Sequence, residues 1–259
     1  MLPQIIDTEI LYSKLFCQSS EERYLIRFWD DEILDMYTHN FTLLINYSEN
    51  LVDIISKELV LRNEQNKTFL RIELNFKMDK LTEDKLRELH IKPEITVYDY
   101  MHIKTDHHRN IVGNTDSIIK KAISDDIMLD GRNVDVLANE AAMGRDFAQR
   151  RIHRKSKVYQ TENLPLDLYV CYHNDLPIGN CELMVLHNIA KIEDFDILEE
   201  YQRKGFGSAI IKYLLKIAEE NDVKDVYLIT DSSDTAKEMY KKCGFEKIGV
   251  KTELFFELK

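Results

Sequence analysis

The sequence predicts an α/β protein whose sheets are mixed (α+β), divided into two domains. Short segments that alternate apolar and polar residues are interleaved with longer segments of helical periodicity. A polar, glycine-bearing stretch at 107–115 (HHRNIVGNT) separates two such α/β runs. Because 44% of the 259 residues are apolar, each run can bury a core. We therefore expect a smaller α/β domain over residues 1–114 and a second domain over residues 115–259.

The first run is expected to alternate strands and helices. Residues 68–76 (TFLRIELNF) alternate in hydropathy, as a strand with one buried face does. In order, we expect a strand, a helix and a strand within 23–47, a helix over 50–64, a strand over 68–76, a helix over 82–89 with Thr82 as its N-cap, and a strand over 95–103.

The second run begins after the polar stretch and follows the same logic. We expect a strand over 117–123, largely helical structure over 125–155, a hairpin of 166–173 with 178–187, and strands over 191–198 and 225–230. Helices are expected after the glycine-bearing segment 202–209 and over 235–243.

Composition narrows the class of protein. No apolar run reaches the ~18 residues of a membrane span, and the N-terminus has no secretory pattern. The four cysteines show no CxxC pair, which favours reduced thiols in the cytoplasm, without disulfides or a metal site. The net charge of −11 disfavours nucleic acid and anionic membranes as partners. It favours a cationic small molecule or basic peptide, unless the charge serves solubility alone.

The segment Gln202-Arg203-Lys204-Gly205-Phe206-Gly207-Ser208 carries the clearest chemical signal. It lies between an expected strand and an amphipathic helix. Glycines there let the backbone approach a ligand, and the first N–H groups of a helix lack intrahelical partners and carry partial positive charge. Such a junction suits a diphosphate. Glycine spacing alone leaves open a turn that only packs the helix onto the sheet.

The segment resembles motif A of the GCN5-related N-acetyltransferase (GNAT) superfamily, Gln/Arg-x-x-Gly-x-Gly/Ala, through Gln202, Gly205 and Gly207. The ending Ala236-x-x-x-Tyr240-x-x-x-Gly244-Phe245 is similar to the family's second motif. The resemblance covers about 117–259 and is clearest from residue 191 onward. A similar helix-to-strand junction at 86–94 suggests a degenerate GNAT-like copy in the N-terminal half, with chance similarity as the alternative.

The resemblance implies a GNAT (acyl-CoA N-acyltransferase) fold whose sheet parts after its fourth strand, here 191–198, and acetyl-CoA as co-substrate with no metal. It implies that pantetheine meets the backbone of Phe195, Ile197 and Leu198. The cofactor contacts implied for the loop and the following helix are Gln202, Arg203, Lys204, Gly205, Phe206, Gly207, Ser208 and Ser233. Ser233 stands where the family usually has asparagine, and Glu199 stands where it often has proline.

The resemblance further implies direct attack by an acceptor on the thioester, with Tyr240 donating a proton to the departing sulfur. For the base, Glu193 is the first candidate and Asp196 the second, since strand alternation sends Glu193 to one face and Asp194 and Asp196 to the other. These acids could instead only solvate the strand and attract a cation.

We therefore predict a cytoplasmic N-acetyltransferase acting on an amine of a small molecule or peptide. Two alternatives stay open: a non-catalytic module that binds acetyl-CoA or a partner, and an O-acetyltransferase acting on a sugar hydroxyl. The sequence does not decide between a monomer and a homodimer, or which acceptor is used.

Overall fold

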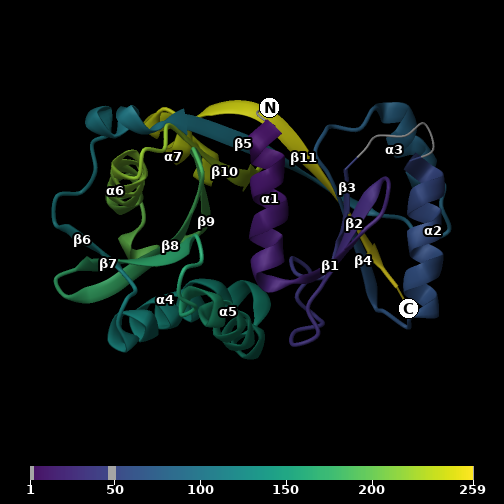
Figure 1. Cartoon of the computed structure of the whole chain (residues 1–259), viewed down its shortest axis with the longest axis horizontal. Helices are drawn as coiled ribbons and strands as arrows, with labels where there is room; N and C mark the ends of the chain where they lie inside the picture. The colour runs from purple at the N-terminus through teal and green to yellow at the C-terminus, as the bar shows by residue number, and fades with distance from the viewer. Residues whose placement is uncertain (1–2, 46–50, 259) are drawn as a thin grey trace. The chain divides into compact units, whose positions relative to one another are not determined.

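The computed structural model describes residues 3–45 and 51–258 (Figure 1). The chain forms two compact units that are interleaved in sequence. Unit 1 comprises Met1–Tyr12, Met101–Ile229 and Asp234–Lys247, and unit 2 comprises Ser13–Tyr100, Thr230–Ser233 and Ile248–Lys259. A division into separately folding domains at 114/115 stays a prediction.

Unit 2 is an α/β layer whose strands run in the order β1-β2-β3-β4-β11-β5. Its elements are β1 (Gln18–Glu21), β2 (Leu25–Trp29), β3 (Thr42–Leu44), α2 (Leu51–Glu64), β4 (Phe69–Leu74), α3 (Lys80–Arg87), part of β5 (Glu94–Lys104) and part of β11 (Glu246–Glu257). Strand β4 is buried along its whole length and pairs antiparallel with β11 and parallel with β3.

Two expectations for unit 2 are wrong. No helix forms between β2 and β3, because Asn40 Nδ2 donates to the carbonyls of Ile33 and Met36 and its Oδ1 accepts from the Asp30 amide, which stabilises turns instead. The N-cap of α3 is Asp79, whose carboxylate accepts from the Thr82 amide at 2.8 Å. Asp79, three residues earlier, takes the role expected of Thr82.

Unit 1 contains a second set of strands, with helices packed on them. Its strands run in the order β5-β10-β9-β8-β7-β6. Strands β9 and β10 pair in parallel, whereas the pairs β8–β9, β7–β8 and β6–β7 are antiparallel. Its elements are α1 (Pro3–Phe16, in part), η1 (Thr105–Asn110), β6 (Ser117–Lys121), α4 (Asp125–Met143), α5 (Arg145–Tyr159), β7 (Leu166–His173), β8 (Leu176–Leu186), β9 (Ile189–Ile197), η2 (Glu199–Tyr201), α6 (Phe206–Glu220), β10 (Asp225–Asp231) and α7 (Ala236–Cys243).

Helices cover both faces of these strands, with α4 and α5 on one side and α6 on the other (Figure 1). The apolar face expected for α6 is buried, with Ile211, Leu214 and Leu215 fully enclosed. The expected helical stretch 125–155 is two helices, because Gly144 takes a left-handed φ of 81° between α4 and α5. Helix α1 falls in a stretch for which the sequence patterns predicted no element.

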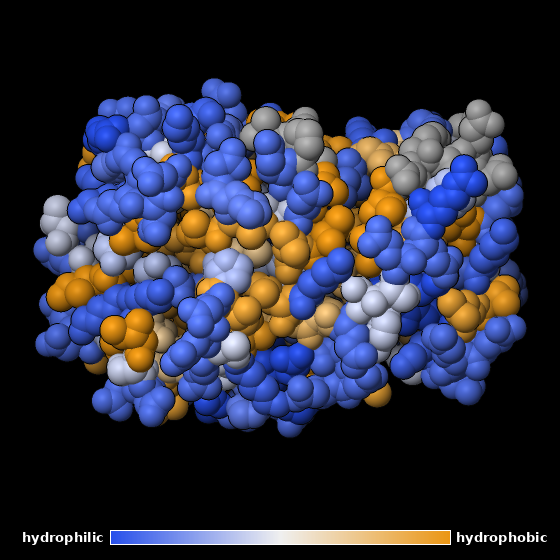
Figure 2. All heavy atoms as spheres, in the orientation of Figure 1, coloured by the Kyte–Doolittle hydropathy of each residue, from blue (hydrophilic) through white to orange (hydrophobic). Residues whose placement is uncertain are grey.

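Hydrophilic side chains dominate the face seen in Figure 2, with apolar side chains gathered in patches between them. Within the described residues, no helix is long and apolar enough to cross a bilayer.

Candidate acyl-transfer site

The junction between β9 and α6 has the geometry of an anion-binding loop. Strand β9 ends at Ile197, and α6 begins at Phe206 after a loop in which Arg203 and Gly205 both have left-handed φ values, 59° and 83°. Gly205 is the N-cap of α6, and among the described residues no side chain caps this helix end. Its first N–H groups are therefore available to a ligand, with the exposed side chains of Arg203 and Lys204 beside them.

The loop is held from a distant part of the chain. The Asn114 amide donates to the Gly205 carbonyl at 3.0 Å, and Asn114 Nδ2 donates to the Lys204 carbonyl at 2.9 Å. A Cβ on Gly205 would lie 3.2 Å from the Asn114 nitrogen, and one on Gly207 would lie 2.5 Å from the Met239 sulfur. The glycines thus permit close packing as well as an open helix end. Nothing in the sequence pattern pointed to Asn114.

The sheet parts beside this loop. The register between the parallel strands β9 and β10 runs from Ile189↔Asp225 to Lys191↔Tyr227, and within the described residues it goes no further. The remainder of β9, from Ile192 to Ile197, therefore has an edge without a β10 partner. This confirms the parting expected after the fourth strand of the second α/β run, and the uncapped end of α6 lies just beyond it.

Not all of the backbone groups of β9 that are expected to meet pantetheine are available to a ligand. The Leu198 amide donates to the Ile178 carbonyl at 2.9 Å, so this N–H is directed toward β8. The Ile197 carbonyl accepts from Gln202 Nε2 at 2.9 Å, which fixes the start of the loop. Within the part of the chain that the structure describes, the backbone of Phe195 makes no hydrogen bond to this loop.

A β-bulge in β9 changes which side chains share a face. Asn180 pairs with Asp196, but Glu182 pairs with Glu193, so β9 has one extra residue between the two rungs. Asp194 takes a left-handed φ of 44° at this place. Its carboxylate binds Lys155, which also binds Glu182, the cross-strand partner of Glu193. The expected simple alternation is therefore wrong: Glu193 and Asp194 lie on the same face.

Tyr240 of α7 lies beside the open stretch of β9. Its ring meets that of Phe195 edge-on, with centroids 6.2 Å apart and an interplanar angle of 90°. Burial, followed by the nearby Cys181 and Glu193, raises the pKa of Tyr240 above its ordinary value, so the hydroxyl stays protonated at neutral pH. Among the described residues this hydroxyl has no hydrogen-bond partner. The Tyr240 hydroxyl can therefore donate its proton to a bound ligand.

The two candidate bases have different surroundings. Glu193 Oε2 lies 2.9 Å from the buried ammonium of Lys191. Asp196 Oδ2 accepts from Asn139 Nδ2 at 3.1 Å and has no ion pair among those found in the described residues. Burial, reinforced by the carboxylates of Asp194 and Asp135, raises the pKa of Asp196 to about 7. Asp196 can therefore exchange a proton near neutral pH.

The basic run at 150–157 supplies structural cations. Arg151 donates to both oxygens of Asp135, at 2.8 and 2.7 Å, and to Asp194 at 2.7 Å. Lys155 is 3% exposed and contacts Glu182 at 2.5 Å. These side chains fix the bulge of β9 from α5. Both side chains are turned inward, toward buried carboxylates.

Ser233 lies in the segment Thr230–Ser233 of unit 2, whereas the loop from Gln202 to Ser208 is part of unit 1. Its hydroxyl donates to Asp231 Oδ1 at 2.7 Å, and its amide donates to the same oxygen. The side chain is thus engaged in a local turn after β10.

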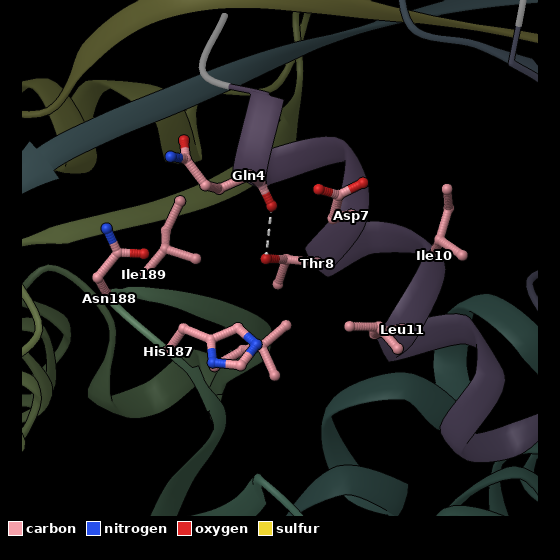
Figure 3. Close-up of a pocket in the computed structure, with 9 residues that line it drawn as sticks. Gln4, Asp7, Thr8, Ile10, Leu11, His187, Asn188 and Ile189 are labelled. Atoms are coloured by element: carbon pink, nitrogen blue, oxygen red, sulfur yellow. Dashed lines mark hydrogen bonds between the residues drawn. The ribbon is translucent and has the colours of Figure 1, made fainter.

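A separate cavity of about 370 Å³ lies at the opposite end of β9 (Figure 3). Gln4, Asp7, Thr8, Ile10 and Leu11 of α1 line one wall, and residues 186–189 of the β8–β9 turn line the other. It adjoins the paired end of β9 and does not include the residues of the β9–α6 loop. No group of three or more potential metal ligands occurs within the described ranges 3–45 and 51–258.

Comparison with known proteins identifies a family for part of the chain. Residues 139–245 match the model of the acetyltransferase (GNAT) family. Over 123 residues the chain is 34% identical to an uncharacterized N-acetyltransferase, CgeE, of Bacillus subtilis (strain 168), a match that spans 46% of this chain and 47% of that relative. The match thus covers about half the length of the curated relative.

Solved structures share the fold over nearly the whole chain. A conserved protein of unknown function from Staphylococcus epidermidis ATCC 12228 is 21% identical with a TM-score of 0.77, covering 95% of this chain and 96% of the other. A GCN5-related N-acetyltransferase from Kribbella flavida is 12% identical with a TM-score of 0.72, covering 98% and 94%. A tandem GNAT protein from the clavulanic acid biosynthesis pathway is 12% identical with a TM-score of 0.58, covering 90% of this chain and 78% of the other. With its glycine loop and parted strands inside the matched region, the chain contains a domain of the GNAT acetyltransferase family over residues 139–245.

Proposed function

We propose that this protein transfers an acetyl group from acetyl-CoA to an amine of a small molecule or peptide. The observation that carries the proposal is the conjunction of two features: β9 and β10 part after Lys191 and Tyr227, and the next helix begins with an uncapped end at Gly205. A pantetheine arm fits an unpaired strand edge, and a diphosphate fits exposed helix N–H groups.

In this proposal the loop residues hold the diphosphate. The N–H groups at Phe206, Gly207 and Ser208 open the helix, and Arg203 and Lys204 add positive charge. The backbone of Phe195 and Ile197 meets the pantetheine amides. We assign Leu198 a smaller part because its N–H is bonded to β8. When bound, acetyl-CoA would supply an activated acyl group at the open stretch of β9.

The residues on either side of that stretch would move the protons. An ammonium acceptor, with a pKa near 10, must lose a proton before its nitrogen can attack. The new C–N bond forms as the C–S bond breaks. The acceptor's proton passes to a carboxylate of β9, and Tyr240 gives its proton to the departing thiolate. Because Tyr240 remains protonated at neutral pH, it is in the state that this role requires.

The structure favours Asp196 over Glu193 as the base. A general base is most effective when its pKa is near the working pH, and the pKa of Asp196 is raised to about 7. Glu193 is committed to the Lys191 ammonium at 2.9 Å. We therefore reverse the order given by the sequence and assign Glu193 the role of a fixed negative charge that attracts a cationic acceptor.

Two other functions would use the same fold. A non-catalytic acetyl-CoA-binding module would need the loop but not the proton donor, and the local engagement of Ser233 motivates this alternative. An O-acetyltransferase would accept a sugar hydroxyl and would need a stronger base than an amine does. The acidic residues of β9 favour a cationic acceptor over a neutral one.

The test combines binding with turnover. Acetyl-CoA is titrated into the protein by calorimetry, and release of free thiol is then followed with a monoamine, a diamine, an amino acid, a short basic peptide and a neutral sugar. Binding with amine-dependent thiol release supports the proposal. Binding without release from any acceptor supports the module, and release with the sugar alone supports O-acetylation. Absence of binding removes all three.

A further inference from the structure

Helix α1 reaches the point where β9 and β10 part, although it lies more than a hundred residues before the region that matches the family. Lys191 and Tyr227 form the last paired rung of the two strands. Side chains directly opposite each other on paired strands project from the same face. Both reach a single carboxylate oxygen of α1: Glu9 Oε1 lies 2.7 Å from Lys191 Nζ and 2.7 Å from the Tyr227 hydroxyl.

The Lys191 ammonium connects Glu9 to the candidate site. It is 3% exposed and contacts Glu9 on one side and Glu193 Oε2, at 2.9 Å, on the other. It also lies 4.0 Å from the centre of the Tyr12 ring, which gives a cation–π contact. A buried ammonium needs these partners, because an uncompensated charge in the interior is costly. The position of Lys191, and through it that of Glu193, therefore depends on α1.

Tyr12 provides a second connection, one helical turn after Glu9 on the same face of α1. Its hydroxyl donates to Glu182 Oε2 at 2.6 Å and accepts from Lys155 Nζ at 3.1 Å. Lys155 also binds Asp194, the bulged residue of β9. Glu182 is the cross-strand partner of Glu193. Tyr12 thus joins α1 to α5, to β8 and to the bulge.

We propose that Glu9 and Tyr12 are positioning residues for the acyl-transfer strand. They fix the root of the parted strands and the bulge that sets which face carries Glu193, Asp194 and Asp196. The N-terminal helix is then a working part of the transferase unit. This proposal rests on the proposed function for its catalytic consequence, but its effect on the strand itself is independent of turnover.

The experiment uses the full chain and near-isosteric variants. Glu9→Gln keeps the shape but removes the charge, and Tyr12→Phe removes only the hydroxyl. Asp7→Asn removes an exposed carboxylate from the same helix and serves as the matched control. Hydrogen exchange is followed by mass spectrometry in peptides covering 189–197 and 225–231, with peptides from α6 as an internal reference. Turnover is followed by thiol release with the most active amine of the panel above.

We expect exchange in 189–197 to become at least about ten-fold faster in Glu9→Gln and Tyr12→Phe, with α6 unchanged. We expect kcat to fall by about ten-fold or more while the calorimetric Kd for acetyl-CoA stays within about two-fold, because the phosphate loop does not depend on α1. Asp7→Asn should match the wild type in all three measurements.

Exchange and kcat that match the Asp7→Asn control in both variants would overturn the positioning role. If the wild type releases no thiol with any acceptor, the proposed transferase fails, and the exchange data alone then decide whether α1 holds the strand. Equal acceleration of exchange in every peptide would show general destabilisation and would also count against the proposal.

Discussion

Asn139 Nδ2 lies 3.1 Å from Asp196 Oδ2, and the same amide donates to the Asp135 carbonyl at 2.9 Å. This contact joins α4 to the open end of β9. Asp196 thus has a neutral hydrogen-bond donor as its partner. Among the ion pairs found in the described residues, none includes Asp196. Burial beside other carboxylates can therefore raise the pKa of Asp196 to about 7. The site and the contacts around it lead to five predictions.

The charge on Asp196 should control activity and stability in opposite directions. Its pKa is raised from 3.8 to about 7, so its contribution to stability is full below about pH 4 and is lost as the pH rises through 7. Asp196→Asn should therefore stabilise the fold at pH 8, by up to about 4 kcal/mol at 1.36 kcal/mol per pKa unit, and have little effect at pH 4. Denaturant unfolding at both pH values measures this.

Activity should show the converse dependence. With Asp196 as the base, kcat of the wild type should rise as the pH passes 7, and Asp196→Asn should lose this limb together with about 10²-fold or more of kcat. Glu193→Gln serves as the comparison, and it should mainly raise the KM for a cationic acceptor. A full pH profile retained in Asp196→Asn would remove Asp196 from the mechanism.

Removal of the Tyr240 hydroxyl should slow transfer without weakening the cofactor complex. Tyr240→Phe keeps the edge-on contact with Phe195, so the fold and the acetyl-CoA Kd should change little. The loss of a positioned proton donor should lower kcat by about 10²-fold. Tyr213→Phe, on α6, is the control, since that ring packs edge-on against Tyr169. Equal kcat values for the two variants would contradict the role.

A carboxylate at the start of α6 should abolish acetyl-CoA binding. Gly205→Asp places a side chain at a φ of 83°, 3.2 Å from the Asn114 nitrogen, and puts negative charge where the diphosphate is expected. Gly144→Asp is a matched control because Gly144 has a φ of 81° and open space around it. Gly205→Asp carries the backbone cost of a left-handed residue, about 1–2 kcal/mol, and Gly144→Asp, at a ψ of 144°, carries about 1–3 kcal/mol. Calorimetry should show binding only in the control.

The buried ion pairs of α5 should matter more for stability than their exposed neighbours. Arg151→Met removes the bidentate contact of Arg151 with Asp135 and its single contact with Asp194. Because these carboxylates are then left without that partner in the interior, the fold should be destabilised by about 3–5 kcal/mol. Arg150→Met, next to it, removes an exposed pair with Asp146 and should cost about 0–1 kcal/mol. The two free energies of unfolding are compared by urea titration, and equal values would contradict the burial argument.

The sequence by itself determined the elements that depend on neighbours along the chain. The amphipathic pattern of α6, the loop from Gln202 to Ser208 and the glycine after α7 are contiguous, so periodicity and glycine placement were enough to predict them. The parting of β9 from β10 came from the family resemblance, and the register confirms it.

Only the tertiary structure decided features that join distant segments. The bulge at Asp194 depends on its pairing with β8 and on cations of α5, and Asn114 meets Gly205 from about ninety residues away. Glu9 reaches Lys191 and Tyr227 across an even longer separation. Such contacts leave no local periodicity, because their energy comes from burial and charge pairing once the chain has folded. For this reason, only the fold indicates which carboxylate of β9 is available to act as a base.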